Sequence, residues 1–204
     1  MNQGSAEKPT VYIVDDDPSI CHAMEFLMRS VGYDYAVFHS GDDFLGGYSN
    51  GLAGCLLLDI RMPGLGGMEL QDKLAEMGST LPIIFITGHA DVPMAVEAMQ
   101  KGAVDFIQKP FRDQDLLDRI GSALQKDRER RSDQRLKADV QDRISKLTKR
   151  EKEVLDLVVT GKPNKVIAYE LGVSQRTVEI HRARVMEKMQ ARSLADLVRM
   201  RIGA

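Results

Sequence analysis

The stretch CLLLDI at residues 55–60 indicates the fold of this chain, because it closes an apolar run with a carboxylate, Asp59. A short continuous apolar run of this kind is typical of a strand that is buried on both faces of a sheet. Three further apolar runs also end in polar side chains: VYIV at 11–14 before Asp15–Asp17, IIFI at 83–86 before Thr87, and DFIQ at 105–108 before Lys109. Groups capable of chemistry therefore follow several of the expected strands.

Helical patterns separate these runs. Between the first two expected strands, Ile20, Met24, Leu27 and Val31 recur at helical spacing, with Ser19 available as the N-cap. Strands that alternate with helices predict an α/β fold with a parallel, doubly wound sheet. The expected strands are 10–14, 33–38, 55–59, 83–87 and 105–108, and the later helices are 40–48, 68–77, 92–100 and one that begins at Asp113.

Parallel sheets place their functional sites at the carboxyl ends of the strands. Asp15, Asp16, Asp59, Thr87 and Lys109 would therefore meet at one edge of the sheet. Crowded carboxylates repel one another unless a cation lies among them, and oxygen ligands of this kind suit Mg²⁺. A lysine beside a metal-bound carboxylate is suited to pairing with phosphoryl oxygens. The set predicts phosphoryl transfer onto Asp59.

The C-terminal part has the pattern of a helix-turn-helix. Thr148 begins T-K-R-E, a capping-box pattern that precedes an apolar helical stripe. A short helix over 164–171 closes at Gly172, Ser174 caps the next helix at 175–189, and a last helix from Ser193 extends to about residue 200. Two helices joined by a tight turn predict that the second one enters the major groove of DNA.

The charge distribution agrees with a division into two parts. Residues 1–125 carry 8 basic and 18 acidic side chains, whereas residues 126–204 carry 20 basic and 12 acidic ones. A basic C-terminal part points to nucleic acid as its partner. Solvation of a helix is the alternative explanation, and we favour it for residues 126–135. Residues 145–204 alone still carry 13 basic against 7 acidic side chains.

The residues Asp15, Asp16, Asp59, Thr87 and Lys109–Pro110 resemble the site of a bacterial response-regulator receiver domain. The segment 148–189 resembles the LuxR-type helix-turn-helix. Together they resemble the FixJ/NarL group of two-component regulators, and RMPGLGGMEL and TGHADVPMAVEAM are closer to FixJ. The resemblance implies a flavodoxin-like five-stranded receiver and an all-α four-helix DNA-binding domain. The expected divisions are a tail at 1–8, a receiver at 9–125, a helical linker at 126–144 and a LuxR-type domain at 145–204.

The resemblance also implies roles for the site residues. Asp59 would be the phosphoacceptor, with Lys109 and Thr87 binding the phosphoryl group. Asp16 and Asp59 would hold Mg²⁺ (or Mn²⁺) directly and Asp15 through water, and the resemblance adds the backbone carbonyl of Arg61. The Lys109–Pro110 bond would be cis. Thr87 and Phe106 would be switch residues, although Phe106 could simply be a core residue. Arg61 and His89 would control the access of water to the acyl phosphate, or are surface residues at loop tips. Asp17 is expected to be only a helix cap or a surface residue, as is Ser19.

In the predicted recognition helix, Val178, Val185 and Met189 form the core stripe. The opposite face carries the residues expected at base edges: Arg176, Glu179, Ile180 and Ala183. Residues better placed for phosphates are Asn164, Lys165, Ser174, Thr177, His181, Arg182, Arg184 and Lys188. A solvated amphipathic helix without base contacts is the alternative.

The expected function is phosphorylation-dependent transcription regulation, with a sensor histidine kinase as phosphodonor and promoter DNA as target. We expect an activator that contacts RNA polymerase, by family analogy, and not an enzyme. Phosphorylation would drive homodimerisation through the helix 92–100 and the strand 105–108, with these candidate contacts: Val92, Met94, Val96, Lys101 and Asp105. The alternative is a constitutive DNA binder whose receiver acts as a protein–protein module without phosphate.

The sequence also indicates where the protein is located and what kind of linker joins its two parts. No segment approaches the ~18 consecutive apolar residues that span a membrane, and the first residues lack the pattern of a signal peptide, so we expect a cytoplasmic protein. The gap in apolar residues at 125–135 argues against a continuous coiled coil and favours a solvated helical or partly mobile linker.

Overall fold

The structure is a computed structural model that describes residues 8–88 and 92–203. The chain divides into two compact units, one ending at Arg130 and one beginning at Arg131. Helix α5 spans Asp113–Ser145 without a break, so the segment 125–135 is helical throughout. The expectation of a helical linker is consistent with this helix.

The first unit contains the predicted parallel sheet. Its five strands lie in the order β2-β1-β3-β4-β5, and each neighbouring pair is parallel. Their bounds are β1 Thr10–Val14, β2 Asp34–Phe38, β3 Gly54–Asp59, β4 Ile83–Thr87 and β5 Asp105–Gln108. The predicted α/β class and doubly wound topology are thus confirmed, with strand ends displaced by a residue at most.

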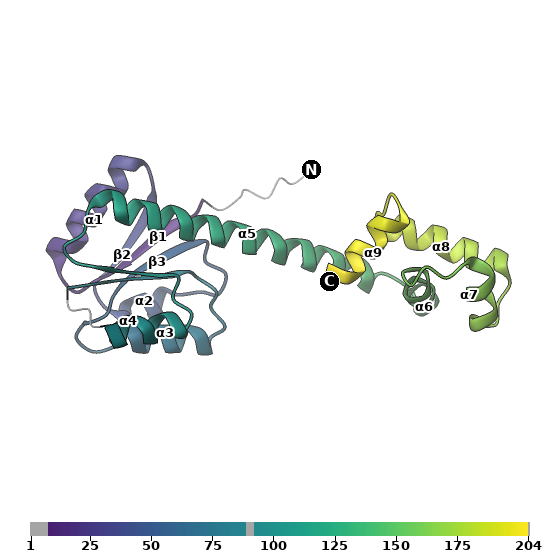
Figure 1. Cartoon of the computed structure of the whole chain (residues 1–204), viewed down its shortest axis with the longest axis horizontal. Coiled ribbons are helices and arrows are strands. Elements are labelled where there is room, and N and C mark those ends of the chain that lie inside the picture. Colours follow the sequence, from purple (N-terminus) through teal and green to yellow (C-terminus); the bar gives the residue numbers. More distant parts are fainter. Residues whose placement is uncertain (1–7, 89–91, 204) are drawn as a thin grey trace. The chain divides into compact units, whose positions relative to one another are not determined.

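Helices cover both faces of this sheet (Figure 1). Helix α1 and the first part of α5 pack on one face, around a core that includes Met28 and Leu116. Helices α2, α3 and α4 pack on the other face, around a core that includes Phe44 and Leu70. The helix bounds are α1 Pro18–Val31, α2 Gly41–Gly47, α3 Gly67–Glu76 and α4 Val92–Gln100. Strands β3 and β4 are buried along their whole length, as their apolar runs predicted.

Of the two residues that the sequence offered as caps of α1, the structure uses one. Asp17, not Ser19, is the N-cap, and its carboxylate accepts a hydrogen bond from the Ser19 amide at 2.8 Å. The prediction of Ser19 as cap was wrong because Pro18 already occupies the first helical turn, where a missing N–H is tolerated. The preceding carboxylate is then the group that can reach the free amides.

The second unit is helical: after the end of α5 come α6 Lys149–Val158, α7 Asn164–Leu171, α8 Gln175–Met189 and α9 Leu194–Gly203. Its core includes Val154, Ile167, Val178 and Leu197. The predicted capping box is present, since Thr148 accepts from the Glu151 amide and Glu151 accepts from the Thr148 amide. None of the helices described is long and apolar enough to cross a membrane.

Candidate functional site: an acidic edge of the sheet and a recognition helix

Strand β3 carries Asp59 to the carboxyl edge of the sheet, where the residue is 8% exposed. The turn after β3 is tight. The Gly67 amide donates to the Ile60 carbonyl at 2.9 Å, and a Cβ at Gly67 would lie 2.2 Å from the Asp59 carbonyl oxygen. Only glycine permits this approach of α3 to the strand end. The Arg61 amide donates to Oδ2 of Asp59 at 2.7 Å and fixes the orientation of the carboxylate.

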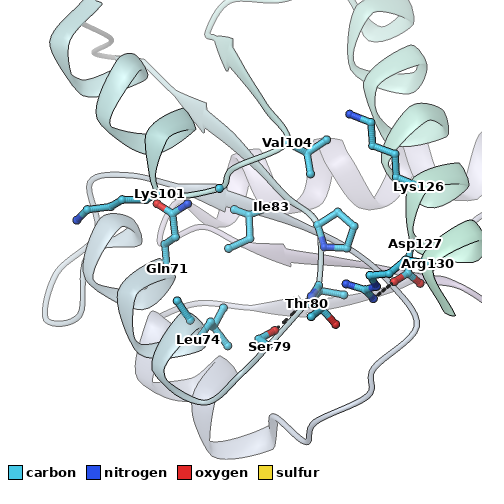
Figure 2. A pocket seen from close by; sticks show the side chains of 14 residues that line it. Gln71, Leu74, Ser79, Thr80, Ile83, Lys101, Val104, Lys126, Asp127 and Arg130 are labelled. Atoms are coloured by element: carbon cyan, nitrogen blue, oxygen red, sulfur yellow. Dashed lines mark hydrogen bonds and ion pairs between the residues drawn. The ribbon is translucent and has the colours of Figure 1, made fainter. Parts of the chain in front are cut away.

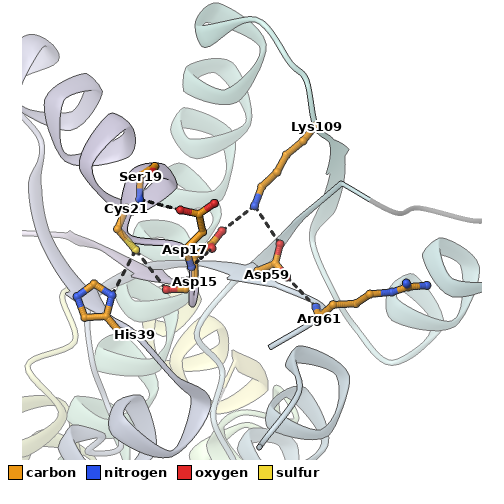
Figure 3. Close-up of polar contacts among 8 residues, drawn as sticks. All are labelled: Asp15, Asp17, Ser19, Cys21, His39, Asp59, Arg61 and Lys109. Carbon is orange, nitrogen blue, oxygen red and sulfur yellow. Dashed lines mark hydrogen bonds and ion pairs between the residues drawn. The ribbon is translucent and has the colours of Figure 1, made fainter. Parts of the chain in front are cut away.

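Asp15, at the end of β1, is held in the same way. Its Oδ1 accepts from the Asp17 amide at 2.9 Å. Its Oδ2 lies 2.7 Å from the Lys109 Nζ, which is also 3.0 Å from Oδ1 of Asp59. Figure 3 shows the ammonium between the two carboxylates. The structure thus brings together three of the predicted residues from β1, β3 and the end of β5.

Lys109 balances an unfavourable pair of charges. Burial raises the pKa of Asp59, and the Asp15 carboxylate adds to this, while hydrogen bonding to Lys109 opposes both. Burial alone would lower the pKa of Lys109, but its contacts with Asp15 and Asp59 outweigh burial and raise it. The main-chain clamps from Arg61 and Asp17 were not predicted. In both cases the donor is the amide two residues after the carboxylate. Many Asp and Asn side chains could form such a bond, so the sequence alone does not show which ones do.

Asp16 is exposed, unlike its neighbour Asp15. Within residues 8–88 and 92–203, no three acidic, histidine or cysteine side chains are close enough to hold a metal ion between them. The donors present are nevertheless hard oxygens, and the two buried carboxylates need positive charge nearby. Both properties fit Mg²⁺ or Mn²⁺.

Thr87 ends β4 at the same edge and is 1% exposed. Its carbonyl accepts from the Lys109 amide at 2.8 Å, and Lys109–Pro110 is cis, as expected. Gly88 has open space where a side chain would be. Phe106 is half-buried against the core beneath α4. His89 lies outside the described residues.

The face formed by α4 and β5 has an apolar centre. Val96 is 47% exposed, and Met99, which was not among the predicted contacts, is 45% exposed. Met94 is instead half-buried against the core. Two candidates are engaged in ion pairs: Lys101 with Asp72 and Glu97, and Asp105 with Arg119 of α5. Nothing is described of the Val92 side chain.

In the second unit, α8 has the two faces that its sequence predicted. Val178, Val185 and Met189 are fully buried. The residues expected at base edges, Arg176, Glu179, Ile180 and Ala183, are all exposed. Ser174 caps the helix by accepting from the Thr177 amide. The helix therefore presents a polar and apolar mixture to solvent on one side.

The residues expected at phosphates fall into two groups. Lys165, Ser174 and Arg184 are exposed, whereas Asn164, Thr177, His181 and Arg182 are half-buried, with Arg182 donating to Asn164 Oδ1 at 3.0 Å. Lys188 differs, because its ammonium lies 2.6 Å from the buried Glu151 carboxylate. This ammonium, with the Thr148 amide, lowers the pKa of Glu151 to about 2.

Two family models match the chain: the response regulator receiver domain at residues 11–121, and the bacterial regulatory proteins of the luxR family at residues 145–201. The chain is a LuxR-type response regulator. Nodulation protein W of Bradyrhizobium diazoefficiens is 47% identical to this response regulator over 196 residues, covering 96% of the chain and 86% of that protein. Transcriptional regulatory protein FixJ of the same organism is 41% identical over 197 residues, covering 97% and 96%.

The response regulator is also similar to solved structures. Response regulator StyR matches with a TM-score of 0.89 at 44% identity, covering 97% of this chain and 100% of that one. The predicted membership of the FixJ-like two-component regulators is confirmed. The family consists of regulators, not catalytic enzymes, and implies a histidine kinase and DNA as partners. Receiver domains of this kind generally bind Mg²⁺.

Proposed function

We propose that this response regulator accepts a phosphoryl group on Asp59 from a sensor histidine kinase and thereby controls its binding to promoter DNA. The observation that carries the proposal is the contact of one ammonium, that of Lys109, with two buried carboxylates at the carboxyl edge of the sheet. A structural ion pair with Lys109 needs only one carboxylate. A second buried carboxylate repels the first, and this local excess of negative charge suits a site for cations that bind phosphoryl groups.

The reaction needs little from the protein beyond positioning and charge. A carboxylate oxygen of Asp59 forms a bond to phosphorus, and the phosphorus–nitrogen bond of the phosphohistidine breaks. The histidine leaves with the bonding electron pair. Lys109 neutralises charge on the transferred group, and Thr87 donates its hydroxyl to it. Bound at Asp16, Asp59 and the Arg61 carbonyl, with Asp15 acting through water, Mg²⁺ or Mn²⁺ would supply further charge neutralisation.

Incubation with acetyl phosphate tests the site. The wild type should gain one phosphoryl group, seen by intact mass, only when Mg²⁺ is present. Asp59→Asn keeps the shape of the side chain and should gain none. Asp17→Asn is the matched control, because Asn also caps helices, and it should be phosphorylated normally. Phosphorylation of Asp59→Asn at the wild-type rate would refute the assignment.

We propose that α8 enters the major groove. The exposed residues Arg176, Glu179, Ile180 and Ala183, opposite a fully buried stripe, support this. The proposed phosphate contacts are Asn164, Lys165, Ser174, Thr177, His181, Arg182 and Arg184. Lys188 we assign instead to the ion pair with Glu151, because its ammonium is already engaged with this buried carboxylate.

Binding to DNA selected from a random library separates base contacts from phosphate contacts. Arg176→Ala should relax the preferred sequence at one position, at a cost of about 1–3 kcal/mol. Arg184→Ala should instead weaken binding to all sequences. The slope of log Kd against log salt concentration should fall by about one, the value for one lost phosphate contact. Lys152→Ala, an exposed change on α6, is the control. A reversed pattern would contradict these roles.

We further propose that phosphate drives dimerisation through the α4–β5 face. Two recognition helices on half-sites about one DNA turn apart sum contacts that one helix alone cannot provide. The exposed apolar pair Val96 and Met99 supports this surface. We propose an activator that acts through RNA polymerase, supported by the family resemblance alone; transcription in vitro that falls on phosphorylation would show a repressor instead.

Sedimentation distinguishes this mechanism from constitutive binding. Phosphorylated protein should sediment as a dimer, and Val96→Glu should remain a monomer while still being phosphorylated. Phe26→Glu, an equally drastic change at an exposed residue of α1, should dimerise normally. Equal mass and equal DNA affinity with and without phosphate would favour the alternative function, a constitutive DNA binder.

A further inference from the structure

A pocket of about 270 Å³ opens at the edge of the sheet opposite Asp59. Its wall includes Ile83, the first residue of β4, whereas the phosphorylation site lies at the carboxyl ends of the strands. The rest is formed by α3, the loops after α3 and α4, and the segment 126–130 of α5. The volume is below the ~300–1,000 Å³ of pockets for drug-sized ligands. A ligand for this pocket must therefore be small.

The inner wall is apolar. Leu74, Leu81 and Ile83 are buried, and Pro82 and Val104 complete the surface. Figure 2 shows Leu74, Ile83 and Val104 around the space, with α3 and α5 on either side. A ligand body of a few methylene groups would be removed from water here, which is favourable.

The rim carries one positive charge, that of Lys126, in excess of its ion pairs. Lys101, Lys126 and Arg130 line the pocket with Asp127, but Lys101 is already paired with Asp72 and Glu97 outside it. Asp127 is 2% exposed, and its two oxygens already accept from the Gly54 amide and from Arg130. It cannot also neutralise Lys126, which is exposed and forms none of the ion pairs found among the described residues. This imbalance favours an anionic ligand.

Two buried polar atoms beside the pocket lack partners within the part of the chain that is described. Gln71 is 3% exposed and donates to the Ala98 carbonyl at 3.1 Å, but its Oε1 accepts from no group. On the other side, Nε of Arg130 has no acceptor. Figure 2 places Gln71 and Arg130 on opposite sides of the pocket. Buried groups of this kind are unfavourable unless paired, so the site favours an acceptor near Arg130 and a donor near Gln71.

We propose that this pocket binds a small organic monoanion that also carries a hydrogen-bond donor, such as a short hydroxycarboxylate. In this proposal the carboxylate lies at Lys126 and Arg130, the apolar body lies against Leu74 and Val104, and the hydroxyl lies beside Gln71 and donates to its side-chain oxygen. Such a ligand holds together α3 and the segment of α5 where the first compact unit ends.

The charge requirement is tested with three probes of equal length on the full chain: hexanoate, hexan-1-ol and hexylammonium. Amide NMR signals of Val104 and Lys126 should shift saturably with hexanoate, about tenfold more weakly with hexan-1-ol, and not with hexylammonium. Lys126→Gln should weaken hexanoate about tenfold, and the control Lys73→Gln, an exposed change on α3 outside the pocket, should not. Equal binding of all three probes, or no saturable shift, would overturn the proposal.

The donor requirement is tested with 6-hydroxyhexanoate. It should bind about fivefold more tightly than hexanoate to the wild type, and this advantage should vanish in Gln71→Met, which has a similar shape without the carbonyl. An advantage retained in Gln71→Met would overturn the role of Gln71. The charge series on the unaltered protein decides the anion site even if Gln71→Met does not fold.

Discussion

Glu151 offers a quantitative prediction, because it is a buried carboxylate with two known partners. Its Oε2 accepts from the Thr148 amide at 2.8 Å and from the Lys188 ammonium at 2.6 Å. These contacts lower its pKa from 4.5 to about 2. One pKa unit corresponds to ~1.4 kcal/mol, so the full difference is about 3 kcal/mol. Lys188 is 35% exposed, and solvent screening reduces the expected contribution to about 2 kcal/mol.

Glu151→Gln keeps the size of the side chain and an oxygen for the Thr148 amide but removes the charge. At pH 7 the second unit should lose about 2 kcal/mol of stability. The folded-state pKa lies below the unfolded one, so the contribution of the carboxylate is present above pH 4.5 and is lost as the pH falls toward 2. The difference between wild type and variant should therefore shrink over that interval.

Urea unfolding followed by methyl NMR signals of Val154 and Val178 measures this in the full chain, because both residues lie in the core of the second unit. Glu153→Gln is the matched control, since Glu153 pairs with the exposed Arg150 one turn earlier on the same helix. It should cost less than about 0.5 kcal/mol. Equal losses for the two variants, or a Glu151→Gln difference that is unchanged from pH 7 to pH 3, would refute the reasoning.

Three further outcomes are expected. Gly54→Ala should destabilise the first unit by about 3–5 kcal/mol in thermal unfolding, because the added Cβ would lie 1.8 Å from a backbone oxygen. Gly78 also has a positive φ but has open space around it, so the control Gly78→Ala should cost only about 1 kcal/mol. Lys109→Met should destabilise the first unit by about 2 kcal/mol at pH 7, and this loss, measured by urea unfolding, should shrink as the pH falls and Asp59, whose pKa burial raises, becomes protonated. Burial raises the pKa of Cys21 to about 11 and of Cys55 to about 12, so both should resist alkylation by iodoacetamide at pH 8 until the protein is unfolded, and rapid modification of the folded protein would contradict this.

The strands were predictable because buried parallel strands have a strong sequence pattern. CLLLDI and IIFIT are apolar up to the residue that reaches the sheet edge, so the pattern locates Asp59 and Thr87 as well as the strands. The contact of Lys109 with Asp15 and Asp59 followed from topology, since strand ends on one edge meet regardless of their separation in sequence.

Other features depended on partners that the sequence does not pair. Lys188 is a basic residue on the predicted recognition helix, which favoured a phosphate contact. Only the fold shows that Glu151 lies beside it. Asp127 lies in a charged segment, 126–135, that carries no apolar signal, yet its carboxylate is buried against the Gly54 amide. In both cases a charged side chain contacts a group that is distant in the sequence. The spacing of nearby residues does not indicate which distant residues become neighbours in the fold.

Lys109 is attached to the molecule at two points with different functions. Its side chain contacts the two carboxylates, and its amide donates to the Thr87 carbonyl as part of the β4–β5 pairing. The main chain of Lys109 is therefore fixed to the neighbouring strand, whereas its flexible side chain carries the ammonium that can follow a newly arrived anion. A substitution at this position removes the charge and both side-chain hydrogen bonds but leaves the main-chain bond to Thr87 in place, so it does not test the connection between the two strands.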